Sequence, residues 1–152
     1  MSLYIPRSPD QSVALTRWVE QRLPDCAPLG PCQTLGILTR DGKRLAAVAA
    51  YNNYREGVSC EGTIVAESAM WATHDHVSAI LAFPFVQLRV RVFIALTSVK
   101  NKRSQKLLEG VGFKLIGTMP DMFDDGPGRI YAMTRRWWLT SKWCPDQFRE
   151  AA

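Results

Sequence analysis

The chain has 152 residues, of which 47% are hydrophobic and 22% charged, values typical of one folded domain with a sufficient core. It has no run of eighteen apolar residues and no apolar stretch with a cleavage site near its start, so we expect neither a membrane span nor a secretory signal. Its 19 Lys and Arg against 14 Asp and Glu give a net charge of +5, which favours an anionic partner: nucleic acid, a phosphorylated cofactor or an acidic surface.

The first third of the chain predicts a strand, a helix and a hairpin. A short strand over 2–6 is followed by Ser8–Gln11, which places a cap residue, a proline and a glutamine in the order that opens a helix. Pro24 ends this helix. Two apolar runs within 34–51 are joined by Asp41-Gly42, a pair typical of the type I′ turn of a β-hairpin.

The rest of the chain predicts alternating strands and helices. In chain order these are a strand over 58–68, a helix that begins at Thr73 or Asp75, a strand over 89–97, a helix over 101–109, a strand over 113–119, an acidic turn over 124–128 and a strand over 129–138. The whole order is typical of a mixed α/β (α+β) domain with helices on both faces of a central sheet. We expect a single domain over 1–152 whose tail, about 139–152, is peripheral.

The four cysteines, Cys26, Cys32, Cys60 and Cys144, form no CxxC pair and lack the spacing of a zinc module. In a chain with a sufficient core and no secretory signal, free thiols in a reducing compartment are the expected state. The sequence therefore predicts a cytoplasmic protein without a structural metal.

The helix predicted over 101–109 begins with an unusual concentration of positive charge. Lys100, Lys102 and Arg103 surround its N-terminus, where the helix dipole is already positive and each cation costs a few tenths of a kcal/mol, roughly. A bound anion would make these charges favourable. The alternative is that the side chains point into water and only solubilise the domain.

The same segment carries the pattern of a known family. Asn101, Ser104, Leu107, Gly112, Phe113 and Gly117 match, with every spacing kept, the helix and following strand of the GNAT N-acetyltransferases. The closing pair Tyr131 and Met133 resembles the last strand of that family, and the likeness extends over about 33–138. The segment FPFVQL is most similar to the branch that acetylates protein N-termini and to its phage and bacterial relatives.

This resemblance implies a GNAT-like, mostly antiparallel sheet with a splayed parallel strand pair, 58–67 and 89–98, that holds acetyl-CoA. The resemblance implies cofactor-binding residues on three elements. These are Ile64, Val65 and Ala66 on the first strand of the pair, Thr73, His74 and His76 at the helix that follows it, and Asn101, Arg103, Ser104 and Lys106 at the helix predicted over 101–109. The acceptor would be a small-molecule amine or a protein N-terminus, and any oligomer would be a homodimer.

Two departures from the family pattern stand out. The segment before the second helix has no glycines of the family's phosphate loop, and His74, Asp75 and His76 stand there instead. Leu108 occupies the position of the tyrosine that protonates the leaving thiolate in many members, and a hydrocarbon donates no proton. His74 and His76 do not predict a metal site either, because helical positions i and i+2 point about 200° apart.

Several side chains are candidates for the proton transfers. Glu67 and Ser68 are the first choice for the base, Glu61 is the second, and Tyr131 is a substitute acid. Each also fits a role outside catalysis: the glutamates as solvated charges at a strand end, and Tyr131 as a tyrosine of the core. The acidic and apolar connection over 119–125 fits either attraction of a cationic amine or a simple polar turn.

Three functions are compatible with the sequence. The first is an acetyl-CoA-dependent N-acetyltransferase, that is, an acyltransferase acting by direct transfer to a primary amine. The second is a GNAT-fold binding or regulatory module with weak CoA chemistry, which the missing glycines and Leu108 favour. The third is a small basic nucleic-acid binder, against which stands the absence of any zinc-finger or RNP motif.

Overall fold

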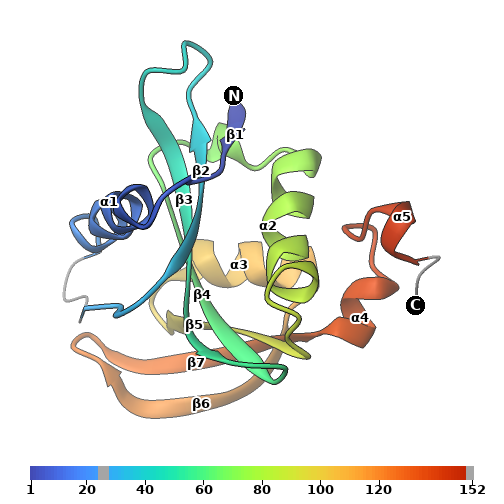
Figure 1. Cartoon of the computed structure of the whole chain (residues 1–152). Helices are drawn as coiled ribbons and strands as arrows, with labels where there is room; N and C mark the ends of the chain where they lie inside the picture. Colours follow the sequence, from blue (N-terminus) through green and yellow to red (C-terminus); the bar gives the residue numbers. More distant parts are fainter. Residues whose placement is uncertain (24–27, 150–152) are drawn as a thin grey trace.

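The structure, a computed structural model, describes residues 1–23 and 28–149 (Figure 1). Its elements are β1 (Ser2–Tyr4), α1 (Pro9–Glu20), β2 (Gln33–Leu38), β3 (Leu45–Arg55), β4 (Ser59–Ala66), the 3-10 helix η1 (Ala69–Trp71), α2 (His74–Val86), β5 (Val92–Ser98), α3 (Lys102–Val111), β6 (Lys114–Phe123), β7 (Gly126–Thr134), α4 (Arg135–Leu139) and α5 (Asp146–Arg149). In the described part of the chain, no helix is long and apolar enough to cross a membrane.

One seven-stranded sheet organises the domain, with the strand order β1-β2-β3-β4-β5-β7-β6. All neighbouring strands are antiparallel except β4 and β5, which run parallel. Figure 1 shows α1 on one face of the sheet and α2 and α3 on the other. The predicted fold class, a mixed and mostly antiparallel sheet with one parallel pair and helices on both faces, is confirmed.

Each face of the sheet has its own apolar cluster. Under α1, Leu15 and Val19 pack on Val48 and Ala50 of β3. On the α2 and α3 side the larger cluster includes Phe93 of β5, which lies 2% exposed among other aromatic rings. Because side chains alternate across a strand, these two clusters fix which residues of β4 and β5 point to which face.

The hairpin of β2 and β3 is confirmed, but its predicted two-residue type I′ turn is wrong. The strands separate after the pair Leu38 and Leu45, and a longer connection follows. Within it the Gly42 amide donates to the Thr39 carbonyl, and Gly42 takes a φ of 68°. The Asp41 carboxylate accepts from the Thr39 hydroxyl and the Lys43 amide, which stabilises this wider loop.

Other element ends differ from the prediction for local reasons. The first strand ends at Tyr4, and α1 ends at Glu20, before Pro24, which lies outside the described residues. The Ser8 cap of α1 is confirmed, since its hydroxyl accepts from the Gln11 amide. The last strand stops at Thr134, whose hydroxyl accepts from the Trp137 amide and so starts α4.

The C-terminal segment packs on the domain through apolar side chains. Trp138 of α4 is 1% exposed and stacks on Phe85 of α2, with ring centroids 5.2 Å apart. Cys144 is also buried, and Phe148 packs against Trp138. The described part of the predicted peripheral tail is therefore in contact with the main core.

Candidate active site

A fork between β4 and β5 lies at the centre of the sheet. Among the described residues their pairing covers three positions, Ser59–Glu61 against Val92–Ile94. Beyond them β4 continues to Ala66 and β5 to Ser98 without further pairing. The two parallel strands therefore diverge toward their carboxyl ends, where open sheets place ligands.

Backbone groups of β4 point into this fork. The Val58 carbonyl accepts from the Val92 amide on the β5 side, whereas the Glu67 amide donates to Ala46 on the β3 side. Because successive residues of a strand direct their N–H and C=O groups to opposite sides, Ile64 and Ala66 direct theirs toward β5. Beyond the paired segment these two N–H groups are donors available to a ligand in the fork.

The N-terminus of α3 closes the β5 side of the fork. Asn101 is the N-cap, and its Oδ1 accepts from the Ser104 amide at 3.0 Å. The buried Gln105 amide group donates to the carbonyls of Ser98 and Val99 and ties the helix to the end of β5. The predicted helix is thus confirmed. The Asn101 oxygen is engaged by the helix, whereas its NH₂ group has no hydrogen-bond partner among the described residues.

The four cations around this helix end are exposed. Within the described residues the structure gives no ion pair to Lys100, Lys102, Arg103 or Lys106. Positive side chains that gain no carboxylate partner beside a helix N-terminus repel the helix dipole. An anion at the fork would reverse the sign of this interaction.

The N-terminus of α2 is arranged differently. Thr73 is its N-cap and accepts from the His76 amide. His76 is turned back, because its Nδ1 lies 2.9 Å from the Trp71 carbonyl oxygen and so carries the proton. Neither histidine is placed as part of a metal centre: no group of three or more metal-ligating side chains occurs in the described ranges.

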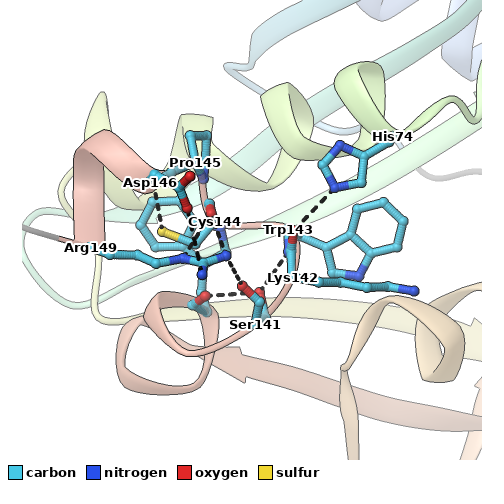
Figure 2. A network of polar contacts seen from close by, with 9 residues as sticks. His74, Ser141, Lys142, Trp143, Cys144, Pro145, Asp146 and Arg149 are labelled. Carbon is cyan, nitrogen blue, oxygen red and sulfur yellow. Dashed lines mark hydrogen bonds and ion pairs between the residues drawn. The ribbon is translucent and has the colours of Figure 1, made fainter.

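The C-terminal segment reaches the same helix end (Figure 2). The His74 ring stacks on Trp143, with centroids 5.1 Å apart, and its Nε2 lies 3.1 Å from the Lys142 carbonyl oxygen. Arg149 holds the turn that presents these residues by donating to the carbonyls of Ser141 and Cys144. This contact could not be predicted from local sequence, because His74 and Lys142 are 68 residues apart.

The predicted proton-transfer residues lie in unlike settings. Glu67 is exposed and its Oε1 accepts two hydrogen bonds, at 2.8 and 2.9 Å, from Arg22. Arg22 also lies over the Trp18 ring, so the pair is anchored at the end of α1. The Ser68 hydroxyl caps η1 by accepting from the Met70 amide. The ion pair of Glu67 with Arg22 could not be predicted from the sequence, because the two residues are 45 positions apart and no local pattern links them.

Glu61 lies at the base of the fork. It pairs with Ile94 in the last position before β4 and β5 diverge, and it is partly exposed. Among the described residues it has no ion pair. Among the described residues its carboxylate is therefore not engaged by a cation, whereas that of Glu67 accepts two hydrogen bonds from Arg22.

The two positions considered for the proton donor, Leu108 and Tyr131, are both buried. Leu108 is 9% exposed on α3, at the position where the family pattern has tyrosine. Tyr131 is fully buried on β7, and its hydroxyl donates to Glu109 Oε1 at 2.8 Å. Burial raises the pKa of this phenol, and the Glu109 carboxylate adds to the rise, while Arg129 lowers it. The catalytic roles predicted for Glu67, Ser68 and Tyr131 stay predictions.

The arrangement is similar to that of several solved structures. A mutant of the spermidine N-acetyltransferase SpeG from Vibrio cholerae is similar with a TM-score of 0.72 and 11% identity, over 92% of this chain and 98% of that chain. SpeG in complex with CoA and spermine gives 0.64 and 14%, over 73% and 70%. The ribosomal-protein-S5-alanine acetyltransferase from Vibrio fischeri gives 0.62 and 11%, over 75% of this chain.

These similarities define the fold: it is that of the GNAT-family acetyltransferases. The chain spans 64% of the length of the Vibrio fischeri protein, less than two thirds of it. No protein-family model and no curated protein sequence matches the chain significantly. The likeness is therefore one of structure at very low sequence identity.

Proposed function

We propose that the chain is an acetyl-CoA-dependent N-acetyltransferase that transfers the acetyl group directly to a primary amine. The observation that carries the proposal is the fork, in which the Ile64 and Ala66 amides face a gap bordered by the α3 N-terminus. The fold of known acetyltransferases supports it, and so does the neighbour crystallised with CoA and spermine.

The residues of the fork fit an acyl donor that bears phosphates. The exposed cations Lys102, Arg103 and Lys106 have no carboxylate partner in the described part of the chain, and phosphate groups would supply one. Asn101 would donate from its NH₂ group to the pantetheine arm, which Ser104 lines. Thr73, His74 and His76 would meet the nucleotide end, with the helix N-terminus replacing a glycine loop.

The transfer requires one bond to form and one to break. The amine nitrogen attacks the thioester carbonyl carbon, a C–N bond forms, the C–S bond breaks, and CoA leaves as a thiolate. The Ile64 and Ala66 N–H groups would stabilise the negative charge that develops on the carbonyl oxygen. The nitrogen gives one proton to a base, and the thiolate takes one from an acid, so charge is balanced.

We assign the base to Glu61, with Glu67 as the alternative, because Glu67 already accepts two hydrogen bonds from Arg22. For the acid we assign solvent water. Leu108 has no proton to donate, and the buried Tyr131 hydroxyl is already committed to Glu109. Positioning and charge stabilisation then supply most of the rate.

A second candidate is a GNAT-fold binding module with weak or no transfer. The contact of Trp143 and Lys142 with His74 favours it, because the tail sits at the helix end that would receive the nucleotide. The apolar Leu108 favours it as well. Under this candidate CoA or its nucleotide binds without turnover.

Two measurements separate the candidates. Acetyl-CoA at about 100 times its dissociation constant should add about 2.7 kcal/mol of stability, which raises the melting temperature by about 5–10 °C. Thiol release in the presence of a mixed panel of amines then tests transfer. Binding with release supports the enzyme, binding without release supports the module, and no thermal shift removes both. A cytoplasmic location and a homodimer stay predictions.

A further inference from the structure

One face of the sheet beside the fork is not covered by α2 and α3. Phe93, Ala95 and Thr97 of β5 are buried on the side of these helices, so Ile94, Leu96 and Ser98 point to the opposite face. On that face α1 lies over β2 and β3, away from β6 and β7 (Figure 1). We call the part formed by β5, β7 and β6 the open face.

Apolar side chains gather on the open face near the mouth of the fork. Leu96 is 39% exposed and Met119 is 49% exposed. Met119 is on the same face because it pairs with Gly128, which in turn pairs with Ser98. A contiguous exposed apolar patch is a mark of interaction sites and ligand-binding grooves.

Because Gly128 has no side chain, the side chains of Met122 and Phe123 can pack against the sheet at this position. A Cβ added there would lie closer than 3.0 Å to Met122 and Phe123, a separation that real Cβ atoms do not adopt. The side chains of Met122 and Phe123 therefore occupy the space above Gly128, next to the end of β5. Phe123 remains 37% exposed, so part of this residue stays accessible to a ligand.

Carboxylates border the same surface. Asp125, from the turn between β6 and β7, accepts from the Ser98 hydroxyl with both oxygens, at 2.9 and 3.0 Å. Since Ser98 points to the open face, this bond fixes the Asp125 carboxylate at the mouth of the fork. Glu61 shares the face at the base of the fork, because it pairs with Ile94. In the described residues neither carboxylate has a Lys or Arg partner.

The carboxylates lie at the end of the open face near the mouth of the fork, whereas Lys114 shares this face at the other end of β6, where its Nζ lies over the Trp137 ring. The protein carries a net charge of +5, and the cations around α3 stand on the far side of the fork from the α1 face. A negative and apolar surface in a basic protein favours a ligand that is cationic and partly apolar. It disfavours amino acids and other amines that bear carboxylate or sulfonate groups.

We propose that the open face binds the acceptor, and that the acceptor is a primary ammonium ion attached to an apolar group. The proposal rests on the acetyltransferase function stated above and specifies its second substrate. Asp125 attracts the ammonium group, while Leu96, Met119 and Phe123 contact the apolar group. The ammonium loses one proton to Glu61, which passes it to solvent, before its nitrogen attacks the thioester. A second proton leaves the nitrogen as the C–N bond forms and the C–S bond breaks, and the CoA thiolate takes up one, so the transfer yields the amide, the CoA thiol and one released proton.

A binding measurement tests the face without requiring turnover. The methionine methyl groups are labelled with carbon-13, and 2-phenylethylamine is added to the protein in the presence of CoA. The methyl signals of Met119 and Met122 are expected to shift. The signal of Met133, which is 1% exposed and pairs with Phe93 on the opposite face of the sheet, is the control and should not move. Taurine, an amine of opposite end charge, should shift neither.

A kinetic measurement tests the carboxylate. Asp125→Asn should raise the KM for 2-phenylethylamine by about tenfold, because one charge-assisted interaction is lost, and should leave the KM for acetyl-CoA unchanged. Asp146→Asn removes another exposed carboxylate, on α5, and should change neither constant. Phe123→Ala should raise the KM for 2-phenylethylamine more than that for methylamine.

The outcomes distinguish this proposal from the proposed function. Thiol release with taurine as efficient as with 2-phenylethylamine, or unmoved Met119 and Met122 signals, would overturn the acceptor class while the transferase remains. Shifted methionine signals without thiol release from any amine would overturn the transferase and leave an amine-binding face. Absence of both effects would remove both.

Discussion

Gly62 provides a sharp test of how β4 and β5 are packed at the base of the fork. A Cβ at this position would lie well inside 3.0 Å of Phe93 Cε2 and Cζ. Phe93 cannot simply move aside, because its ring packs on Phe113 at 5.4 Å, Tyr51 at 5.8 Å and Phe85 at 6.4 Å. Gly62→Ala therefore overpacks the core.

Overpacking of this kind costs about 1–3 kcal/mol. In a domain of this size that loss lowers the melting temperature by about 2–12 °C. The assay is urea and thermal unfolding of the variant beside the parent chain. Because the strained contact lies where β4 and β5 separate, we also expect weaker acetyl-CoA binding.

Gly110→Ala is the matched control. No heavy atom outside its own helix lies within 4 Å of a Cβ added there, and the residue is in α3. Alanine should stabilise this position by about 0.5–1 kcal/mol, since it restricts the unfolded chain and favours the helix. A Gly62→Ala protein as stable as the parent would refute the placement of Phe93 against β4.

Three further predictions concern single side chains. Asn101→Ala should weaken CoA binding and cost about 1 kcal/mol as a lost helix cap, whereas Asn101→Ser should keep the stability and still lose affinity; CoA affinities equal to that of the parent chain in both variants, by calorimetry, would remove Asn101 from the site. Burial raises the pKa of the Tyr51 and Tyr131 phenols above 10.0, so only the unfolded chain ionises them and stability should fall as the pH rises above about 10. Urea midpoints at about pH 8 and pH 10.5 check this, and an unchanged midpoint would contradict it. Burial raises the pKa of Cys60 to about 12, so iodoacetamide should label it only after unfolding, as read by mass spectrometry, and rapid labelling of the native protein would disprove the burial.

The parts of the fold that the sequence predicted well are those with local causes. Ser8, Thr73 and Asn101 cap their helices through their own side chains, so their positions are visible in a few residues. Gly112 takes a φ of 101° and ends α3, as a glycine after a helix predicts. The order of elements then follows from their types, and with it the sheet.

The parts that the sequence missed depend on distant partners. The ion pair of Arg22 with Glu67 joins two elements that only the folded sheet brings together. The stack of His74 on Trp143 likewise depends on the path of the C-terminal segment. The pair Asp41-Gly42 predicted a two-residue turn. The Asp41 carboxylate instead stabilises a wider loop by accepting from Thr39 and Lys43, and the rule for a two-residue turn does not include these hydrogen bonds.

The candidate site shows the same division. The cations at the start of α3 could be named from the charge of that segment, and the positions of Ile64 and Ala66 from the family pattern. The environment of the candidate acids and bases could not, because burial of Tyr131 and the engagement of Glu67 are properties of the packed structure. For the same reason Glu61, the second choice from sequence, becomes the first once the pairing of β4 with β5 is known.

Backbone amide NMR during an acetyl-CoA titration tests the central claim most directly. If the diverging strands hold the acyl donor, the amide signals of Ile64, Ala66 and Ser104 shift together with one dissociation constant, while that of Leu35, buried in β2, stays in place. Saturation with acetyl-CoA that leaves the Ile64 and Ala66 amides unmoved would contradict the account.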